Sequence, residues 1–239
     1  MDNAPRTLAA LLSDPPLLHD DPAGGTTSWQ LSDEALRFID AHIQAGSRTL
    51  ETGEGLSTVL FALRGAEHIC VTPNTGVVER IRRFCSAAGI GLDQVTFKIG
   101  FSQDVLPGLD PAPLDLVLID GGHGFPIPFV DWLYTAGRLR VGGLLIVDDT
   151  HIWTGDALKR FIGAEPEWQL VSDLGPRSSA FRKVAESDRP KEWNDQPFVV
   201  RASEHGDWGG KLRRGIAMLR RGDLRTFRDR MSEYVTRRP

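Results

Sequence analysis

Short apolar runs alternate with helical patterns along the middle of this chain, and this alternation constrains the fold more than any other feature. We predict strands at residues 48–52, 68–72, 95–99, 114–120, 143–149, 168–174 and 179–184. Helices are predicted between them, at residues 57–64, 76–89, 129–139 and 156–163. Strands that are apolar throughout and separated by helices are typical of a parallel sheet covered on both faces. Because crossovers between parallel strands are right-handed, we expect an α/β fold with a doubly wound, mostly parallel sheet.

Three segments are predicted from changes in composition along the 239 residues. Residues 1–46 form an N-terminal arm, irregular where Pro, Gly and Asp are frequent, and then a helix for which Ser32 is a good N-cap. Residues 47–185 hold the alternating strands and helices and form the main domain. Residues 186–239 form a basic helical extension with a break near Gly222, which docks onto the main domain or onto a second copy of the chain.

Charge and cysteine content argue against several classes of protein. The net charge is -4, but residues 201–239 carry eleven Lys and Arg against five Asp and Glu. Acidic residues interleave with these arginines, so a solvated or partner-facing helix is favoured over a nucleic-acid site. No apolar run approaches the ~20 residues of a membrane span, and the first residues lack the basic leader of a secretory signal. Two cysteines without a metal or disulfide pattern suit a reducing compartment, so we expect a cytoplasmic protein.

A glycine-rich turn follows the first predicted strand. In "LETGEGLST", residues 50–58, Gly53 and Gly55 allow a tight turn that brings backbone N–H groups close to a ligand. Thr58 stands where a dinucleotide fingerprint has its third glycine. The carboxylate of Glu51 would repel a pyrophosphate, whereas it suits a ligand with a positive charge, such as an ammonium group. The turn therefore argues against an NAD-dependent dehydrogenase.

This turn resembles motif I of the class I S-adenosylmethionine-dependent methyltransferases, E/D-x-G-x-G, and the resemblance extends over residues 49–184. It implies a Rossmann-like, seven-stranded sheet and S-adenosylmethionine as the cofactor. In that family the acid lies near the methionine part of the cofactor, and the glycines pack against it. The resemblance therefore assigns Glu51, Gly53, Gly55 and Ser57 to cofactor binding.

The ends of the next two strands also bear on the cofactor. The family normally has an acid at the end of the second strand, which holds the ribose hydroxyls. This chain has Thr72 there and Asn74 two residues further on, and either side chain can form a hydrogen bond without the strength that a carboxylate gives. After the third strand, the resemblance places Phe101 and Ser102 in the adenine pocket, with core packing as an equal alternative for Phe101.

Three carboxylates follow two further predicted strands. Asp120 opens the sequence "DGGH" at the end of one strand, and Asp148 and Asp149 end the next. These strands are neighbours in the order typical of the family, so the three carboxylates converge beside the cofactor's methyl group. Carboxylates this close repel one another unless a cation lies between them, and oxygen ligands suit Mg²⁺. The alternative is a structural role for these residues: Asp120 would order a loop at the end of its strand, and Asp148 and Asp149 would cap the helix that follows.

The placement of these acidic residues resembles the pattern found in metal-dependent O-methyltransferases, particularly in the group that acts on sugar hydroxyls of natural products. In that group, D-x-x-H places a histidine near the acceptor hydroxyl. The match makes Asp120 a metal ligand and a catalytic residue that also contacts the cofactor, and it makes His123 the general base. The implied reaction is methyl transfer to a hydroxyl of a small molecule, such as a sugar or glycoside, assisted by Mg²⁺.

Two alternatives remain open. His151, in "DDTH", is a rival base or an additional metal ligand, and Trp153 is a candidate platform for the substrate. A non-catalytic protein on the same fold, which uses its basic C-terminal end to bind a partner, is the alternative from another functional class. Binding of S-adenosylmethionine discriminates between the enzyme and such a scaffold.

Overall fold

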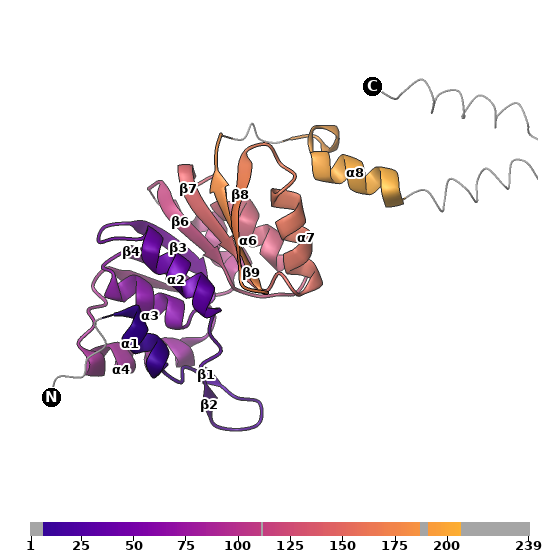
Figure 1. Ribbon diagram of the computed structural model, residues 1–239. Coiled ribbons are helices and arrows are strands. Elements are labelled where there is room, and N and C mark those ends of the chain that lie inside the picture. Colours follow the sequence, from indigo (N-terminus) through magenta and orange to yellow (C-terminus); the bar gives the residue numbers. More distant parts are fainter. Residues whose placement is uncertain (1–6, 111, 187–190, 207–239) are drawn as a thin grey trace, which may run out of the picture. The chain divides into compact units, whose positions relative to one another are not determined.

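The predicted strands form a single sheet in the computed structural model, which describes residues 7–110, 112–186 and 191–206 (Figure 1). The strands are β3 (Arg48–Thr52), β4 (Glu67–Thr72), β5 (Val95–Ile99), β6 (Leu114–Ile119), β7 (Leu139–Val147), β8 (Trp168–Leu174) and β9 (Ser178–Lys183). Their order across the sheet is β5-β4-β3-β6-β7-β9-β8. β3 to β7 pair in parallel, whereas β9 is antiparallel to both β7 and β8. The prediction of a seven-stranded, mostly parallel sheet is confirmed.

Helices cover both faces of this sheet (Figure 1). They are α1 (Leu8–Ser13), α2 (Asp33–His42), α3 (Leu56–Leu63), α4 (Thr75–Ala88), α5 (Ser102–Val105), the short η1 (Leu106–Gly108), α6 (Ile127–Thr135) and α7 (Trp153–Ile162). Leu116 and Leu118 of β6 join a core cluster with α1 to α4. Val117 and Ile119 are equally buried but alternate with them, so they point to the other face, where α6 packs on β6 and α7 on β7. The sheet is therefore doubly wound, as predicted.

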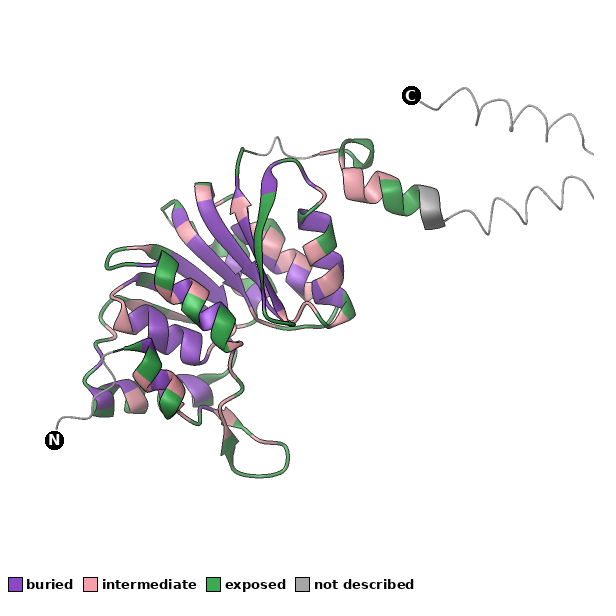
Figure 2. Ribbon diagram, in the orientation of Figure 1, coloured by how far each residue is buried: buried purple, intermediate pink, exposed green. Residues whose placement is uncertain are grey.

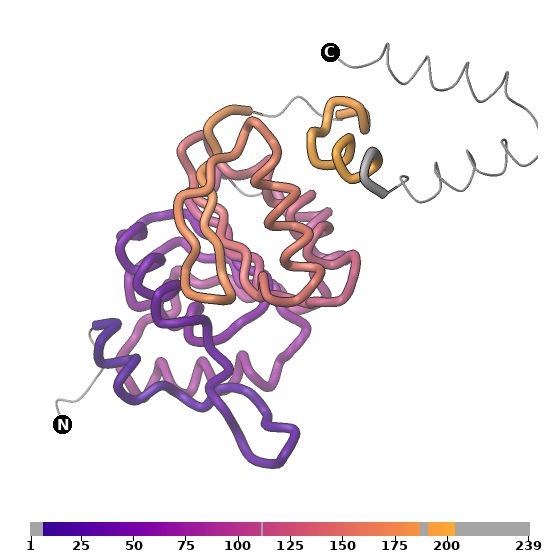
Figure 3. The backbone as a smooth tube through the Cα atoms, turned by 45° about the vertical axis from the view of Figure 1, so that its right-hand side comes forward, coloured from indigo at the N-terminus to yellow at the C-terminus, as the bar shows by residue number. Residues whose placement is uncertain are grey.

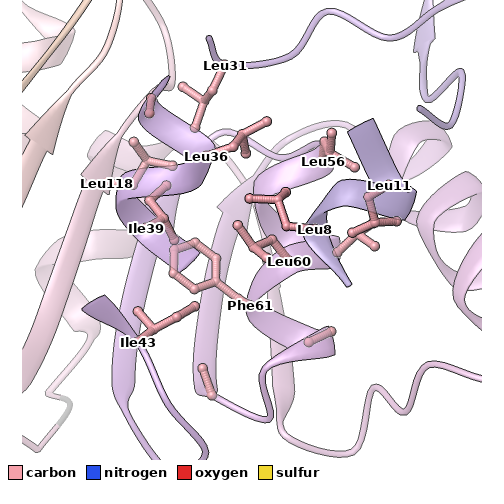
Figure 4. Packing of buried hydrophobic residues seen from close by; sticks show 14 of the residues in the cluster. Leu8, Leu11, Leu31, Leu36, Ile39, Ile43, Leu56, Leu60, Phe61 and Leu118 are labelled. Atoms are coloured by element: carbon pink, nitrogen blue, oxygen red, sulfur yellow. The ribbon is translucent and has the colours of Figure 1, made fainter. Parts of the chain in front are cut away.

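The core on the first face is built from helical spacing. Leu36 and Ile39 of α2 pack toward Leu60 and Phe61 of α3, and all four side chains are fully buried (Figure 4). Each such side chain contributes about 1.5–3 kcal/mol relative to an exposed position. The central strands β3 and β6 and the second half of β7 are buried along most of their length, as Figure 2 shows. This core fixes the strand ends from which the site is built.

The N-terminal arm differs from its prediction as an irregular segment. Besides α1, residues 19–27 form a small antiparallel pair, β1 (His19–Asp20) and β2 (Thr26–Thr27). The reason is apolar burial: Leu8, Leu11 and Leu18 belong to the same core cluster as α2 and α3. The arm is therefore part of the folded unit over its described length.

Several element boundaries also move. The predicted helix at 129–139 ends at Thr135, and β7 already begins at Leu139, four residues before the predicted strand. Gly142, with a φ of 87°, lies inside β7, and the register between β6 and β7 shifts near there. The last two strands, β8 and β9, run as an adjacent pair at one edge of the sheet (Figure 3).

The chain divides into two units, Met1–Asp188 and Arg189–Pro239. The described part of the second unit holds η2 (Trp193–Asp195) and α8 (Pro197–Gly206). The two helices predicted around Gly222 lie outside the described residues. Among the helices that are described, none combines the length and the hydropathy needed to cross a membrane.

Candidate active site

The site begins at the glycine turn between β3 and α3. Gly53 has a φ of 91°, and a Cβ atom added there would lie 2.1 Å from the carbonyl oxygen of Asp120. Only glycine allows this approach, because any side chain would collide with the backbone at the end of β6. The amide of Asp120 also donates to the Thr52 carbonyl oxygen at 3.1 Å. The turn after β3 and the turn after β6 are therefore held against each other.

Thr58, at the position of the missing third glycine, caps α3. The Gly55 amide donates to the Thr58 hydroxyl oxygen at 3.1 Å, and that hydroxyl in turn donates to the carboxylate of Glu51. A side chain that satisfies a free amide in the first turn of a helix stabilises its start. The departure from the dinucleotide pattern thus has a structural role in this turn.

Glu51 lies in a buried polar network. The Ser57 hydroxyl donates to Glu51 Oε2 at 2.7 Å, and His68 Nε2 lies 3.1 Å from Glu51 Oε1. The opposite nitrogen of His68 pairs with the Thr49 hydroxyl at 2.8 Å. Glu51 and Ser57 are both buried, and neither is among the residues that line the neighbouring cavity. Their assignment to cofactor binding stays a prediction, since the visible role of both side chains is to hold the turn.

A cavity of about 740 Å³ lies at the carboxyl ends of the strands. Its size is within the range of small-molecule sites, about 300–1,000 Å³. The structure brings most of the predicted residues to its wall: Gly53, Thr72, Asn74, Phe101, Ser102, Asp120, His123 and Asp149. Asp148 lines a small adjoining cleft that shares Asp120, His123 and Asp149 with the cavity. Apart from Glu51, Gly55 and Ser57, which line neither space, the predicted metal and cofactor residues therefore border one continuous region.

A carboxyl group that the sequence pattern did not indicate lies in the glycine turn after β3, beside the end of β4. Glu54, between the two glycines of the turn, lines the cavity beside Thr72 and is hydrogen-bonded by the Thr72 side chain. Burial raises the pKa of Glu54 to about 7, and the charge of Glu51 adds to this, whereas Thr72 and Arg80 act against it. Thr72 also accepts from the Asn74 amide at 3.0 Å.

The N-terminal arm forms one wall of the cavity. His19, Trp29 and Gln30 line it, and the rings of His19 and Trp29 stack with centroids 6.0 Å apart. His19 Nε2 donates to the Glu54 carbonyl oxygen at 3.0 Å, and burial lowers the pKa of His19. No sequence motif marked these residues, because only the packing of the arm brings them to the site.

The three predicted carboxylates converge. Ligand oxygens of Asp120, Asp148 and Asp149 all lie within 4.8 Å of one another. The pairing of β6 with β7 explains this, since the Asp148 amide donates to the Ile119 carbonyl oxygen and so places the two strand ends side by side. Burial, and then the charges of Asp148 and Asp149, raise the pKa of Asp120 well above its usual range. The mutual repulsion of the three carboxylates would be relieved by a bound cation.

Part of this charge is balanced by the chain itself. Arg177 Nη2 lies 3.3 Å from Asp148 Oδ2 and 3.5 Å from Asp149 Oδ1. The Ser178 hydroxyl donates to the other oxygen of Asp148. The sequence segment 177–181 indicates only a turn into a strand, so Arg177 and Ser178 are members of the site that sequence analysis missed. One guanidinium balances one of three carboxylates, which leaves the cluster acidic.

His123 is held by the carboxylate of Asp149, with Nε2 at 3.1 Å from Oδ2. In the neutral ring this contact places the proton on Nε2 and leaves Nδ1 as the basic atom. His151 Nδ1 lies 3.5 Å from the other oxygen of Asp149 and also lines the cavity, so the rival base is close by. Asp149 has a φ of 50°, which is rare outside glycine and is found where a site holds the backbone in place.

Two exposed aromatic side chains flank this edge. Phe125 follows His123 in the same loop, and Trp153 begins α7; their ring centroids lie 6.1 Å apart. Both side chains are more than half exposed. The loop and the helix are joined by the Thr154 hydroxyl, which donates to the His123 carbonyl oxygen at 2.5 Å.

Comparison with known proteins agrees with this geometry. Residues 50–150 match the model of a family described as a methyltransferase domain. This range contains the glycine turn, the end of β4 and all three carboxylates.

Solved structures resemble the chain at low sequence identity. Cofactor-bound Rv0187 from MTB is 22% identical with a TM-score of 0.53, over 66% of this chain and 83% of that one. The O-methyltransferase TomG from Streptomyces achromogenes, involved in tomaymycin synthesis and solved with S-adenosylmethionine, is 16% identical with a TM-score of 0.53, over 65% and 82%. An O-methyltransferase from Bacillus cereus in complex with S-adenosylhomocysteine is 18% identical with a TM-score of 0.52, over 64% and 83%.

The matched residues and the shared fold indicate the class of protein. Residues 50–150 match a methyltransferase domain, and the fold is the one found in solved methyltransferases that bind S-adenosylmethionine or S-adenosylhomocysteine. The predicted fold and enzyme class are confirmed, and the individual site residues stay predictions.

Proposed function

We propose that this chain is an S-adenosylmethionine-dependent O-methyltransferase that acts on a hydroxyl of a small molecule, a sugar or glycoside in the first instance. One observation carries the proposal: a glycine-walled cavity opens onto His123 and onto two of three clustered carboxylates, Asp120 and Asp149, with the third, Asp148, in the adjoining cleft. The likeness to O-methyltransferases solved with S-adenosylmethionine or S-adenosylhomocysteine supports the same activity.

The cavity suits S-adenosylmethionine in its size and in the polar and aromatic side chains that line it. Gly53 keeps its wall free of side-chain atoms beside the backbone of Asp120. Thr72 and Asn74 offer polar groups at the end of β4, while Phe101 and Ser102 stand at the start of α5. We assign the ribose to the first pair and the adenine to the second, since the flat aromatic ring of adenine can stack on the exposed ring of Phe101.

The carboxylates and His123 would act on the acceptor. The hydroxyl oxygen attacks the methyl carbon in line with the C–S bond; that bond breaks as the new C–O bond forms. The hydroxyl proton passes to His123 Nδ1, and Asp149 stabilises the imidazolium that results. The products are a methyl ether and S-adenosylhomocysteine, so atoms and charge balance.

The three aspartates fit a hard cation. When bound, Mg²⁺ supplies an electrostatic anchor that orients the hydroxyl and lowers its pKa. Asp120, Asp148 and Asp149 would hold it through oxygen atoms, with Arg177 keeping the last two in position. The exposed rings of Phe125 and Trp153 then offer an apolar surface for the body of the acceptor.

The test is calorimetric titration with S-adenosylhomocysteine, with and without Mg²⁺, followed by a screen of sugars and glycosides as acceptors. We expect micromolar binding of S-adenosylhomocysteine and a separate heat for Mg²⁺. Asp149→Asn, which tolerates the positive φ, should weaken the Mg²⁺ binding at least about tenfold. Asp156→Asn, in a residue paired with Arg160 on α7, is the matched control and should leave both heats unchanged.

The outcomes separate the alternatives. Absence of S-adenosylhomocysteine binding contradicts the enzyme and favours a non-catalytic scaffold. Binding of S-adenosylhomocysteine without any heat for Mg²⁺ contradicts the metal and leaves Arg177 as the permanent cation among the described residues that line the cavity.

A further inference from the structure

The end of β4 lacks the expected acid, but another acid stands beside it. Glu54 lies between Gly53 and Gly55, and its side chain meets that of Thr72 across the cavity wall. Thr72 is the last residue of β4, the position at which the family carries its ribose-binding acid. The two turns after β3 and β4 thus put a carboxyl group at the place where the strand itself has none.

Glu54 has few partners within the described chain. The Thr72 hydroxyl is the hydrogen-bond donor to its carboxyl group, and Arg80 acts on it only as a charge. Arg80 is itself engaged, with Nε donating to the Leu18 carbonyl oxygen and Nη2 paired with Asp20 at 3.1 Å. A carboxylate has about four acceptor positions, and the Thr72 hydroxyl uses one of those on Glu54, which lines the cavity.

We propose that Glu54 replaces the missing acid of β4 and holds the ribose hydroxyls of the methyl donor. This proposal rests on the proposed function, because it concerns the same cavity. A carboxylate accepting two vicinal hydroxyls forms two charge-assisted hydrogen bonds, the strongest kind available to an uncharged diol. Thr72 positions the carboxyl group from the strand end. The selected ligand is therefore a nucleoside with intact 2′ and 3′ hydroxyls.

A partly buried carboxyl group with one hydrogen-bond donor is costly to ionise in the free protein, and this is consistent with a binding role. Burial raises the pKa of Glu54 to about 7, so the free protein holds it partly protonated at neutral pH. The charged groups that act on it are Glu51 and Arg80 of α4. Glu54 in turn acts on Cys70 of β4, whose pKa is raised well above the usual range, mainly by burial. His19 contacts only its backbone. Two hydroxyl donors from a ligand favour the ionised form.

The experiment compares two ligands on two variants. S-Adenosylhomocysteine and its 2′,3′-dideoxy analogue are titrated calorimetrically into wild-type protein, Glu54→Gln and the control Glu79→Gln, an exposed acid on α4. We expect Glu54→Gln to weaken S-adenosylhomocysteine at least about tenfold, because it removes the charge from two hydrogen bonds. The dideoxy analogue should bind wild type and Glu54→Gln within about twofold of each other. The control should match wild type for both ligands.

A pH series adds a readout that a structural role would not move. Wild-type affinity for S-adenosylhomocysteine should rise between pH 6 and pH 8 more than that of Glu54→Gln, since only wild type must ionise this group. Thermal unfolding confirms that each variant is folded. Equal loss of affinity for both ligands, or no loss at all, overturns the role of Glu54. Wild-type protein that binds neither ligand contradicts the proposed function instead, and with it this inference.

Discussion

His123 is the residue on which the proposed chemistry depends most. Its Nε2 contacts Asp149, which leaves Nδ1 to receive the acceptor's proton. We expect His123→Ala to lower kcat about 10²–10⁴-fold with any acceptor found in the screen, the usual contribution of a general base. The affinity for S-adenosylhomocysteine should stay within about twofold, because the imidazole does not bind the donor.

His151→Ala is the matched test of the rival base. Its ring lies further from Asp149, at 3.5 Å, and is about half exposed. We expect a loss of no more than a few-fold in kcat. A larger loss for His151→Ala than for His123→Ala would exchange the roles of the two histidines.

Glu51 also contributes to the stability of the fold, because its carboxylate accepts hydrogen bonds from several buried groups. Glu51→Ala leaves the Ser57 and Thr58 hydroxyls and His68 Nε2 without their acceptor in a fully buried place. Each unsatisfied group costs about 1–3 kcal/mol, so the free energy of unfolding should fall by about 3 kcal/mol or more.

Glu67→Ala provides the comparison in a urea titration. Glu67 is exposed at the start of β4 and pairs with Arg48 at 3.4 Å, an ion pair that contributes less than about 1 kcal/mol. If the two variants unfold at the same urea concentration, the buried network contributes nothing to stability. Cofactor binding is then the better explanation for a carboxylate at position 51.

Sequence analysis found some of these residues and missed others for a physical reason. Asp120, Asp148 and Asp149 stand at the ends of apolar strands, and the order of parallel strands brings such ends together. Glu54 lies inside the glycine turn that the sequence singles out, but only packing brings it beside Thr72 of β4, and Arg177 reaches the site from a segment that no local pattern connects to it. Their side chains became part of the site only when β4 and β9 had been placed in the sheet.

At the scale of elements, the turn between β3 and α3 is the most constrained connection of the fold. Gly53→Ala would put a Cβ atom 2.1 Å from the Asp120 carbonyl oxygen, at a φ of 91°. Either the backbone at the end of β6 moves or the turn does, so we expect a loss of more than about 3 kcal/mol in the free energy of unfolding, or failure to fold.

Gly46→Ala separates the collision from the backbone conformation. Gly46 has a similar φ of 79°, but no atom lies within 4 Å of its added Cβ. It should cost only about 1–2 kcal/mol, the price of a left-handed alanine. Equal losses for both variants in urea unfolding would mean that the close approach of the two turns has no energetic weight.

The same elements show how far sequence sets boundaries. β3, β5 and β8 have the predicted limits, because short apolar or β-branched runs are bounded by polar residues. α7 begins at Trp153 rather than at residue 156, and its N-cap, Ile152, forms no side-chain cap that the sequence could signal. The border between α6 and β7 moved for a comparable reason, since the pairing of β7 with β6 extends the strand back to Leu139.

At the scale of the whole molecule, the cavity links stability to binding. A ligand that binds only the folded protein stabilises it by about 2.7 kcal/mol at one hundred times its Kd. The cavity is bordered by the N-terminal arm, by the turns after β3 and β4 and by the loop after β6, so one ligand bridges segments that are far apart in sequence. The carboxyl group of Glu54 adds a dependence on pH to this balance.

Glu54 should make the free protein less stable as the pH rises. Its pKa is about 7 in the folded state and 4.5 as the ordinary value, so the folded state binds more protons than the unfolded state between these limits. Stability is therefore lost from about pH 4.5 upwards, and the full penalty is present above pH 7. Glu54→Gln, which cannot ionise, should match wild type near pH 4.5 and exceed it at pH 8, by up to about 3 kcal/mol less the screening by water. Thermal unfolding of both proteins without ligand at the two pH values measures this difference. A constant difference across that range would show that Glu54 titrates alike in both states; a fall at pH 8 would mean that its charge stabilises the turn.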